Sequence, residues 1–143
     1  MKAAKNFLEV AWEGEPPSDS ELLEALDRLL VAYHETPKVK FAHSELEPPR
    51  DDWILPYKEV GRRFKDYGYY SVTDPLELDE ENAIMFGDGI DDIADITKEI
   101  RQTVWYSENE SNRAAHWHFT TFYFEWGQHA REMSLYLAAR LSK

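Results

Sequence analysis

The chain has no cysteine among its 143 residues. A disulfide framework, a thiolate zinc site and a thiol nucleophile are therefore excluded. The absence of cysteine is typical of a reducing compartment such as the cytosol. Long apolar runs are also missing, and no stretch approaches the eighteen or more apolar residues of a membrane span. The short apolar patch near the N-terminus is too charged for a signal peptide, so we expect a cytoplasmic protein without a membrane partner.

Basic residues are scarce, with 16 Lys and Arg against 28 Asp and Glu, which gives a net charge of −12. This excess of negative charge repels nucleic acid unless a local basic patch overcomes it. The one compact basic group surrounds Arg62 and Arg63 on a predicted helix. We therefore expect no nucleic-acid partner, whereas an acidic surface suits either a basic protein partner or simple solubility. The sequence leaves the oligomeric state open.

The alternating pattern of a half-buried strand is missing almost throughout the chain. Apolar residues make up 43% of the chain and aromatic residues 14%, which argues against disorder. A chain of this length forms one domain with a substantial core. The sequence therefore predicts an all-α fold over residues 1–143, a single compact bundle of about five helices without a sheet.

The N-terminal half carries clear helix boundaries. A short helix is expected over residues 3–13. Ser18, with Glu21 three positions later, has the form of a capping box and predicts the start of a second helix. That helix ends before Pro37, because the residue before a proline avoids the helical region.

The middle of the chain is less regular. Residues 38–52 are interpreted as a loop of uncertain order, after which Asp51 or Asp52 caps a helix. Gly68 is the expected residue after that helix. An extended segment follows as far as Asp74, and residues 76–87 are acidic and irregular.

Residues 88–141 form the strongest pattern, interpreted as two helices joined by the polar run 107–112. Asp88 or a neighbour caps the first helix. Apolar residues recur in steps of three and four along the second helix and share one face. They are Ala115, Phe119, Phe122, Trp126, Ala130, Met133, Leu137 and Leu141. Since a helical hairpin with a short loop packs antiparallel, we expect the long C-terminal helix to lie on the preceding helix.

Polar side chains on these two helices define a candidate site. His118, Glu125 and His129 fall within a stripe about 40° wide, beside the apolar face. On the preceding helix an acidic stripe runs from Asp88 to Glu99. Antiparallel packing lets the two sets meet. The predicted polar cluster comprises Asp88, Asp92, Asp95, His118, Glu125 and His129.

Two interpretations of this cluster remain open. Carboxylates and imidazoles on facing helices suit Mn²⁺, Fe²⁺ or Zn²⁺, with Mg²⁺ favoured if the aspartates dominate. Glu125 and His129 stand four apart, so the spacing matches neither His-Glu-x-x-His nor the Glu-x-x-His of di-iron bundles. Alternatively, the cluster is a structural network, since acids in a first helical turn favour the helix dipole and a histidine beside aromatics is commonly hydrogen-bonded in a core.

Several segments together resemble a known family. They are Asp91-Asp92-Ile93-Ala94-Asp95-Ile96, Trp117-His118-Phe119, Trp126-Gly127-Gln128-His129 and Gly68-Tyr69-Tyr70 before Asp74-Pro75. From about Phe7 to Leu141 the chain is similar to a bacterial group of small helical domains of unknown function, domain-of-unknown-function family 5063. The family pattern has a histidine where this chain has Glu125, and an aspartate where it has Glu99. The resemblance implies a compact helical fold and no particular activity.

The leading hypothesis for function is a non-enzymatic acidic interaction module, immunity-like or regulatory. Such a module binds a basic protein partner and needs no cofactor. The alternative is a metal-dependent hydrolase-type enzyme that holds a divalent metal in the Asp/Glu/His site between the last two helices. The chain has no glycine-rich phosphate loop and no Ser-His-Asp motif, so no motif assigns a reaction class. The sequence therefore leaves open the catalytic residues, the substrate and the biological role.

Overall fold

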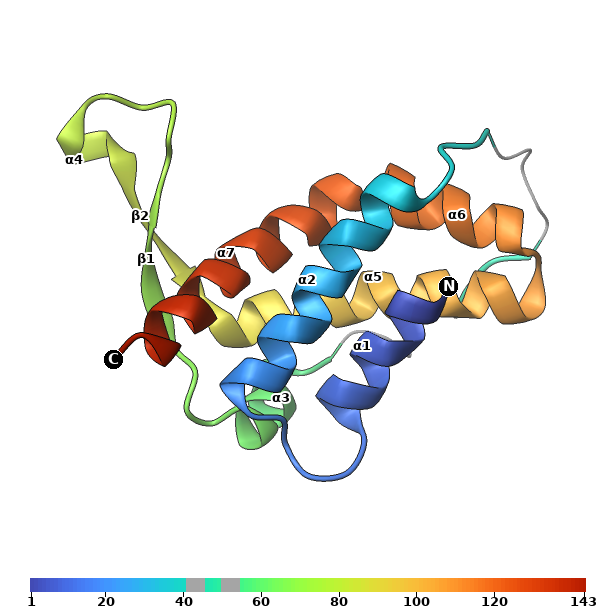
Figure 1. Cartoon of the computed structure of the whole chain (residues 1–143), viewed down its shortest axis with the longest axis horizontal. Helices are drawn as coiled ribbons and strands as arrows, with labels where there is room; N and C mark the ends of the chain where they lie inside the picture. The colour runs from blue at the N-terminus through green and yellow to red at the C-terminus, as the bar shows by residue number, and fades with distance from the viewer. Residues whose placement is uncertain (41–45, 50–54) are drawn as a thin grey trace.

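The computed structural model describes residues 1–40, 46–49 and 55–143 (Figure 1). Within these ranges the protein is mostly helical, with seven helices and a small two-stranded hairpin. The elements are α1 (Lys2–Trp12), α2 (Asp19–Glu35), α3 (Tyr57–Arg63), β1 (Tyr69–Thr73), α4 (Glu80–Ala83), β2 (Ile84–Asp88), α5 (Gly89–Asn109), α6 (Asn112–Thr121) and α7 (Tyr123–Leu141). The predicted helical fold is confirmed, but the expectation of about five helices and no sheet is wrong. Across the described part of the chain, no helix is both long enough and apolar enough to cross a membrane.

The boundaries predicted for α1 and α2 are confirmed to within a residue or two. At the start of α2 the Ser18 hydroxyl accepts from the Glu21 N–H, and the Glu21 carboxylate accepts from the Ser18 N–H at 2.8 Å. This reciprocal capping satisfies N–H groups that have no partner inside the helix. At the other end α2 stops at Glu35, with Thr36 as its cap and Pro37 after it.

The helix α5 lies at the centre of the fold and contacts α1, α3, α6 and α7 (Figure 1). Its isoleucines Ile93, Ile96 and Ile100 are buried in the same core as Phe7 of α1 and Trp126 of α7. The helix α2 completes this core by packing along α7. The fold therefore brings the residues of α5 against the last two helices, as the sequence predicts.

The long C-terminal helix predicted from the sequence is two helices, α6 and α7, which meet at Phe122. Phe122 has φ −91° and ψ 14°, outside the α-helical range. Next to this bend the indole N–H of Trp126 donates to the carbonyl of Phe119 at 3.0 Å. A side chain that takes a helical carbonyl bends the helix, because the carbonyl turns away from the backbone ladder. The helix that lies antiparallel to α5 directly after the turn is therefore the short α6, while α7 contacts both α2 and α5.

The pairing of β1 with β2 is the feature that the sequence prediction missed, since only the extended segment of β1 was expected. The strands pair antiparallel, with Tyr70 opposite Gly87 and Val72 opposite Met85. Figure 1 shows this hairpin projecting from one end of the helices, with α4 at its tip. Gly87 is required there, since a Cβ atom at this position would lie 2.5 Å from the ring of Tyr70. A strand that carries exposed apolar residues and a glycine lacks the alternation by which strands are recognised.

Two smaller expectations for the middle of the chain also change. Gly68 does not follow a helix directly, because α3 ends at Arg63 with Phe64 as its cap. The carbonyl of Gly68 instead accepts from the N–H of Gly89 at 3.0 Å, which joins the base of the hairpin to the start of α5. The predicted cap at Asp51 or Asp52 lies outside the described residues, as does part of the loop predicted over 38–52.

Arg63 closes the C-terminal end of α1. Its Nε donates to the carbonyl of Ala11 at 2.6 Å, and its two terminal nitrogens donate to the carbonyls of Glu13, Gly14 and Glu15 at 3.0–3.3 Å. Carbonyls at the end of a helix have no partner in the helix itself. The guanidinium supplies several donors in one plane and therefore holds α1 against α3.

We predict that Arg63→Met lowers the free energy of unfolding by about 1–3 kcal/mol, because the partly buried charged hydrogen bond to Ala11 is lost together with three exposed ones. Urea unfolding followed by circular dichroism measures this change. The control is Arg62→Met, in which the neighbouring exposed arginine is replaced, and we expect a change within about 0.5 kcal/mol. Equal effects of the two substitutions would contradict the role given to Arg63.

Candidate functional site

A buried carboxylate–histidine pair joins α5 to α6. The Nε2 atom of His118 lies 2.9 Å from a carboxylate oxygen of Glu99, and His118 is only 3% exposed. The ring of His118 stacks on Phe122, at 4.4 Å between ring centroids. Both polar groups are enclosed by protein and hydrogen-bonded to each other, which is what a core requires of buried polar atoms. This pair is therefore explained as a structural contact.

A second pair joins α5 to α7 and reaches the hairpin. His129 Nδ1 lies 2.7 Å from Oδ1 of Asp92, a residue that is only 3% exposed. The hydroxyl of Tyr70, from β1, donates to the other oxygen of Asp92. On the far side of the imidazole ring, Nε2 of His129 lies 3.5 Å from Asp95. Unlike His118, His129 is partly exposed, so this group is accessible from solvent.

The contacts of these groups shift their pKa values in different directions. The hydrogen bond to Asp92 raises the pKa of His129, against the opposing effect of burial. Burial alone would raise the pKa of Glu99, but the hydrogen bond and charge of His118 lower it below its ordinary value.

Burial, followed by the negative charges of Asp88, Asp95 and Asp92, raises the pKa of Asp91. The start of α5 is therefore a region of strong negative potential.

The remaining predicted cluster residues lie elsewhere. Asp88 caps α5 by accepting from the N–H of Ile90 at 3.0 Å, and its second oxygen accepts from the hydroxyl of Tyr57 at 2.8 Å. This hydrogen bond raises the pKa of Tyr57 to about 12. Glu125 is exposed near the start of α7. The six predicted residues thus divide between a helix cap, an exposed position and two separate histidine contacts.

Glu132 and Tyr70 lie beside the accessible Asp92–His129 pair, and the sequence analysis did not predict either of them. Within the described residues, Asp92, His129 and Glu132 each offer a ligand atom, and these atoms lie within 4.8 Å of one another. Glu132 stands three positions after His129, and this spacing on one helix face was the available indication in the sequence. Tyr70 carried no such indication, because its contact depends on where the hairpin folds back.

A groove of about 550 Å³ runs between β1 and α7, beside this group. Tyr70 and Glu132 line the groove, together with Tyr136, whose ring stacks on that of Tyr70 with 4.6 Å between centroids. The Asp92–His129 pair is therefore connected to a surface depression through Tyr70 and Glu132.

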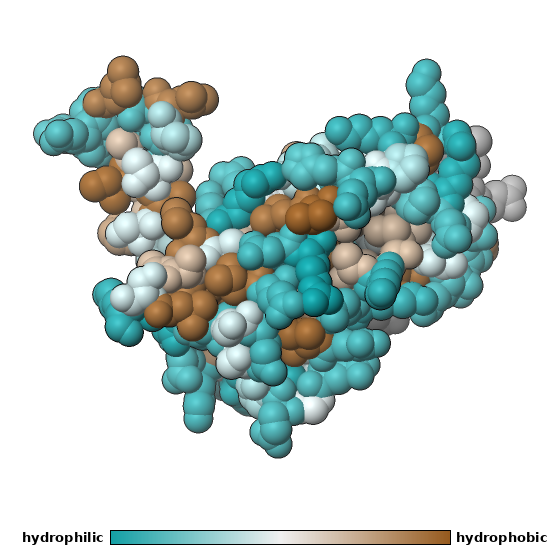
Figure 2. Space-filling model, viewed as in Figure 1, coloured by the Kyte–Doolittle hydropathy of each residue, from teal (hydrophilic) through white to brown (hydrophobic). Residues whose placement is uncertain are grey.

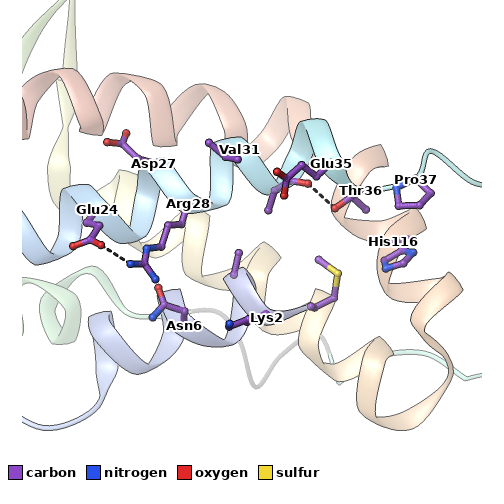
Figure 3. A pocket seen from close by; sticks show the side chains of 13 residues that line it. Lys2, Asn6, Glu24, Asp27, Arg28, Val31, Glu35, Thr36, Pro37 and His116 are labelled. Carbon is purple, nitrogen blue, oxygen red and sulfur yellow. Dashed lines mark hydrogen bonds and ion pairs between the residues drawn. The ribbon is translucent and has the colours of Figure 1, made fainter.

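A second cavity of about 660 Å³ lies between α1, α2 and the start of α6 (Figure 3). Its lining includes Val31, Pro37 and His116, while Arg28 is paired with Glu24 at its edge. Burial lowers the pKa of His116 below its ordinary value. The described lining brings no carboxylate within hydrogen-bonding distance of His116, and we assign it no chemistry.

Comparisons with protein families, curated proteins and solved structures gave no match. The resemblance to domain-of-unknown-function family 5063 therefore stays a prediction.

We predict that the contribution of Glu99 to stability depends on pH in a defined direction. Because the folded-state pKa of Glu99 lies below its ordinary value of about 4.3, its stabilising effect is complete above that value. The effect is lost as the pH falls through the folded-state pKa. The measurement is the difference in free energy of unfolding between the parent and Glu99→Gln, from pH 7 to pH 3. We expect this difference to be largest above about pH 5 and to shrink below about pH 4.

Glu108→Gln serves as the control for this titration, since Glu108 is an exposed carboxylate near the end of the same helix. It reports the effect of removing one surface charge from α5. A Glu99→Gln difference that stays constant across the pH range would show that the pair with His118 does not stabilise the folded state in its charged form.

Proposed function

We propose that this protein is an interaction module whose β1–β2 hairpin docks on a basic protein partner. The observation that carries the proposal is the concentration of exposed apolar side chains on the hairpin and its connecting loop. Leu78 is 93% exposed and Phe86 is 80% exposed. The full set comprises Tyr69, Leu76, Leu78, Ile84, Met85 and Phe86. Figure 2 shows these apolar atoms grouped where the hairpin projects beyond the helices.

The register of the hairpin explains why Tyr69, Ile84 and Phe86 face solvent. Cross-strand partners share a face of the sheet, so Tyr70 lies with Gly87 and Ser71 lies with Phe86. The first face is turned toward α7, where Tyr70 stacks on Tyr136. Tyr69, Ile84 and Phe86 lie on the second face and are exposed, whereas Met85 lies on the first face, opposite Val72. A contiguous exposed apolar surface is a feature of protein–protein contact sites rather than of ordinary monomer surface.

The negative charge of residues 66–97 supports a partner with a basic surface. No Lys or Arg stands between Lys65 and Lys98, whereas this stretch holds many acids. Those in the loop and α4 at the hairpin tip are Asp74, Glu77, Asp79, Glu80 and Glu81. Apolar side chains surrounded by carboxylates complement a surface with an apolar cleft and a basic rim. A second copy of this acidic chain is disfavoured as the partner, because like charges would face each other.

The attachment of the hairpin favours tight binding. Its base is held by the hydrogen bond between Gly68 and Gly89 and by the contact of Tyr70 with Asp92. A surface that is already held in place loses less conformational freedom on association, so more of the contact energy appears as affinity. The β1–β2 hairpin would suit an immunity-like protein that blocks a basic toxin. It would equally suit a regulatory subunit.

We predict that a photocrosslinking phenylalanine analogue at position 86 captures a basic protein in cells that express the intact chain. The matched control carries the same analogue at position 124, since Phe124 is also an exposed phenylalanine, 66% exposed, but lies on α7. Mass spectrometry identifies the adducts. Capture of the same proteins at both positions, or capture of acidic proteins only, would contradict the proposal.

The captured protein then allows a direct affinity measurement. We expect Phe86→Ser to weaken its binding by about tenfold or more, as expected when an aromatic anchor is removed from an interface. Phe124→Ser should leave the affinity unchanged, and neither substitution should lower the unfolding midpoint substantially. Added salt should weaken binding of the parent, because the carboxylates around the hairpin contribute through charge.

The metal-dependent hydrolase hypothesis stays a prediction. The described structure favours it less, because His118 is enclosed with Glu99, Asp88 is a helix cap and Glu125 points to solvent. A catalytic centre requires its acid, base and metal ligands around one substrate position.

A further inference from the structure

Asp92, His129 and Glu132 form a compact set of donors at the junction of α5, α7 and the hairpin. Asp92 comes from the first turn of α5, while His129 and Glu132 are neighbours on one face of α7. Their ligand atoms lie within 4.8 Å of one another. This set differs from the six-residue cluster predicted from the sequence, since it excludes Asp88, His118 and Glu125 and includes Glu132.

The carboxylate of Asp92 is held in an orientation that suits a ligand. The hydroxyl of Tyr70 donates to one of its oxygens, so the other oxygen is directed at Nδ1 of His129. Metal-binding carboxylates are commonly hydrogen-bonded in this way by a neighbouring group, which holds the free oxygen toward the ion. Tyr70 therefore acts as an orienting residue for Asp92.

The imidazole of His129 is oriented in the same manner from its other side. Its Nε2 atom lies 3.5 Å from Oδ2 of Asp95, on the side of the ring away from Asp92. A carboxylate that faces one ring nitrogen leaves the opposite nitrogen for a metal ion. Nδ1 of His129 faces Asp92 and is therefore the nitrogen available for coordination.

The local charge also favours a cation. Among the described residues, the recorded ion pairs of Asp92 and Asp95 are with His129 alone. Glu132 accepts a hydrogen bond from the uncharged amide of Gln128 at 3.0 Å. Three carboxylates thus lie around one imidazole, and within the described residues none of them forms an ion pair with a Lys or Arg nitrogen. A divalent cation would neutralise this charge better than a single proton on His129.

We propose that Asp92, His129 and Glu132 bind a divalent first-row transition ion, with Zn²⁺ as the preferred ion. One imidazole and two carboxylates suit Zn²⁺, Mn²⁺ or Fe²⁺, whereas Mg²⁺ prefers oxygen ligands and bound water. Ligands at about 2.0–2.1 Å in a tetrahedral site lie about 3.3 Å apart. The 2.7 Å contact between Nδ1 and Asp92 must therefore lengthen by about 0.6 Å, and the wider separations within the set, up to 4.8 Å, must shorten, which requires rotation of the side chains.

Three protein ligands leave one position of a tetrahedral ion open. Tyr70 and Glu132 both line the groove of about 550 Å³ between β1 and α7, so this position would be reached from the groove. The site does not depend on the docking function of the hairpin, since it uses none of the exposed apolar residues.

The test uses the full chain after treatment with a chelator. Thermal unfolding and isothermal titration calorimetry are carried out with Zn²⁺, Mn²⁺ and Mg²⁺ alone. We expect Zn²⁺ to raise the unfolding midpoint with increasing concentration, because an ion that binds only the folded state stabilises it. Mn²⁺ should act more weakly than Zn²⁺, and Mg²⁺ should act least. Failure of both Zn²⁺ and Mn²⁺ to bind or to shift the midpoint would overturn the proposal.

Two substitutions on α7 locate the site. Glu132→Gln removes a proposed ligand and should weaken Zn²⁺ binding by about tenfold or more, whereas Glu125→Gln removes an exposed acid two turns earlier and should leave binding unchanged. Equal weakening by both variants would indicate non-specific attraction to acidic surface and overturn the proposal.

Two further measurements probe the ligand geometry without relying on the stability of an Asp92 variant. Tyr70→Phe keeps the ring over Gly87 but loses the hydrogen bond to Asp92, and we expect Zn²⁺ binding about tenfold weaker. Co²⁺ bound in place of Zn²⁺ should give the strong visible absorption of a tetrahedral site in the parent and lose it in Glu132→Gln. A weak octahedral spectrum that is identical in both proteins would contradict the assigned ligand set.

Discussion

The buried polar groups of α5 determine how the rest of the chain is arranged around it. A polar group taken out of water must find a hydrogen-bond partner, or it costs several kcal/mol at most sites. The hydroxyl of Thr103 donates to the carbonyl of Glu99 within α5, whereas the other three buried polar side chains of this helix find their partners on different elements. The contacts are Thr97 with Trp12 of α1, Glu99 with His118 of α6, and Asp92 with His129 of α7 and Tyr70 of β1. The apolar core would tolerate small shifts of these helices, whereas the hydrogen bonds define one register.

This arrangement connects the core of the protein to its surface features. Asp92 is enclosed, yet its two oxygens contact one group on α7 and one on the projecting hairpin. The base of the exposed hairpin is therefore attached to the central helix rather than to a loop. The same carboxylate serves the fold, the orientation of the hairpin and the proposed ion site, so a substitution at Asp92 would change all three together. Variants at Tyr70 and Glu132 separate these roles more cleanly.

Local rules were sufficient for the parts of the structure that depend on neighbouring residues. The capping box of Ser18, the stop before Pro37 and the cap at Asp88 each involve groups a few positions apart, and the structure confirms all three. The meeting of the acidic face of α5 with His129 was also predictable, since it follows from helix periodicity and a short turn. Long-range contacts decided the remainder. Tyr70 reaches Asp92 only because the hairpin folds back, and the bend at Phe122 coincides with an indole that takes a carbonyl seven residues earlier.

The pairing of α2 with α7 has a consequence for the order in which the chain is synthesised. The leucines Leu22, Leu26 and Leu29 of α2 are buried in the core, and α2 packs on α7, about a hundred residues later in the chain. Asp19 at the start of α2 also accepts a hydrogen bond from Arg140 at 2.8 Å. During translation α2 therefore emerges from the ribosome long before α7 exists, when only α1 is available to cover this leucine face. At typical rates of about 5–20 residues per second this interval lasts for several seconds, which makes α2 a natural target for ribosome-associated chaperones.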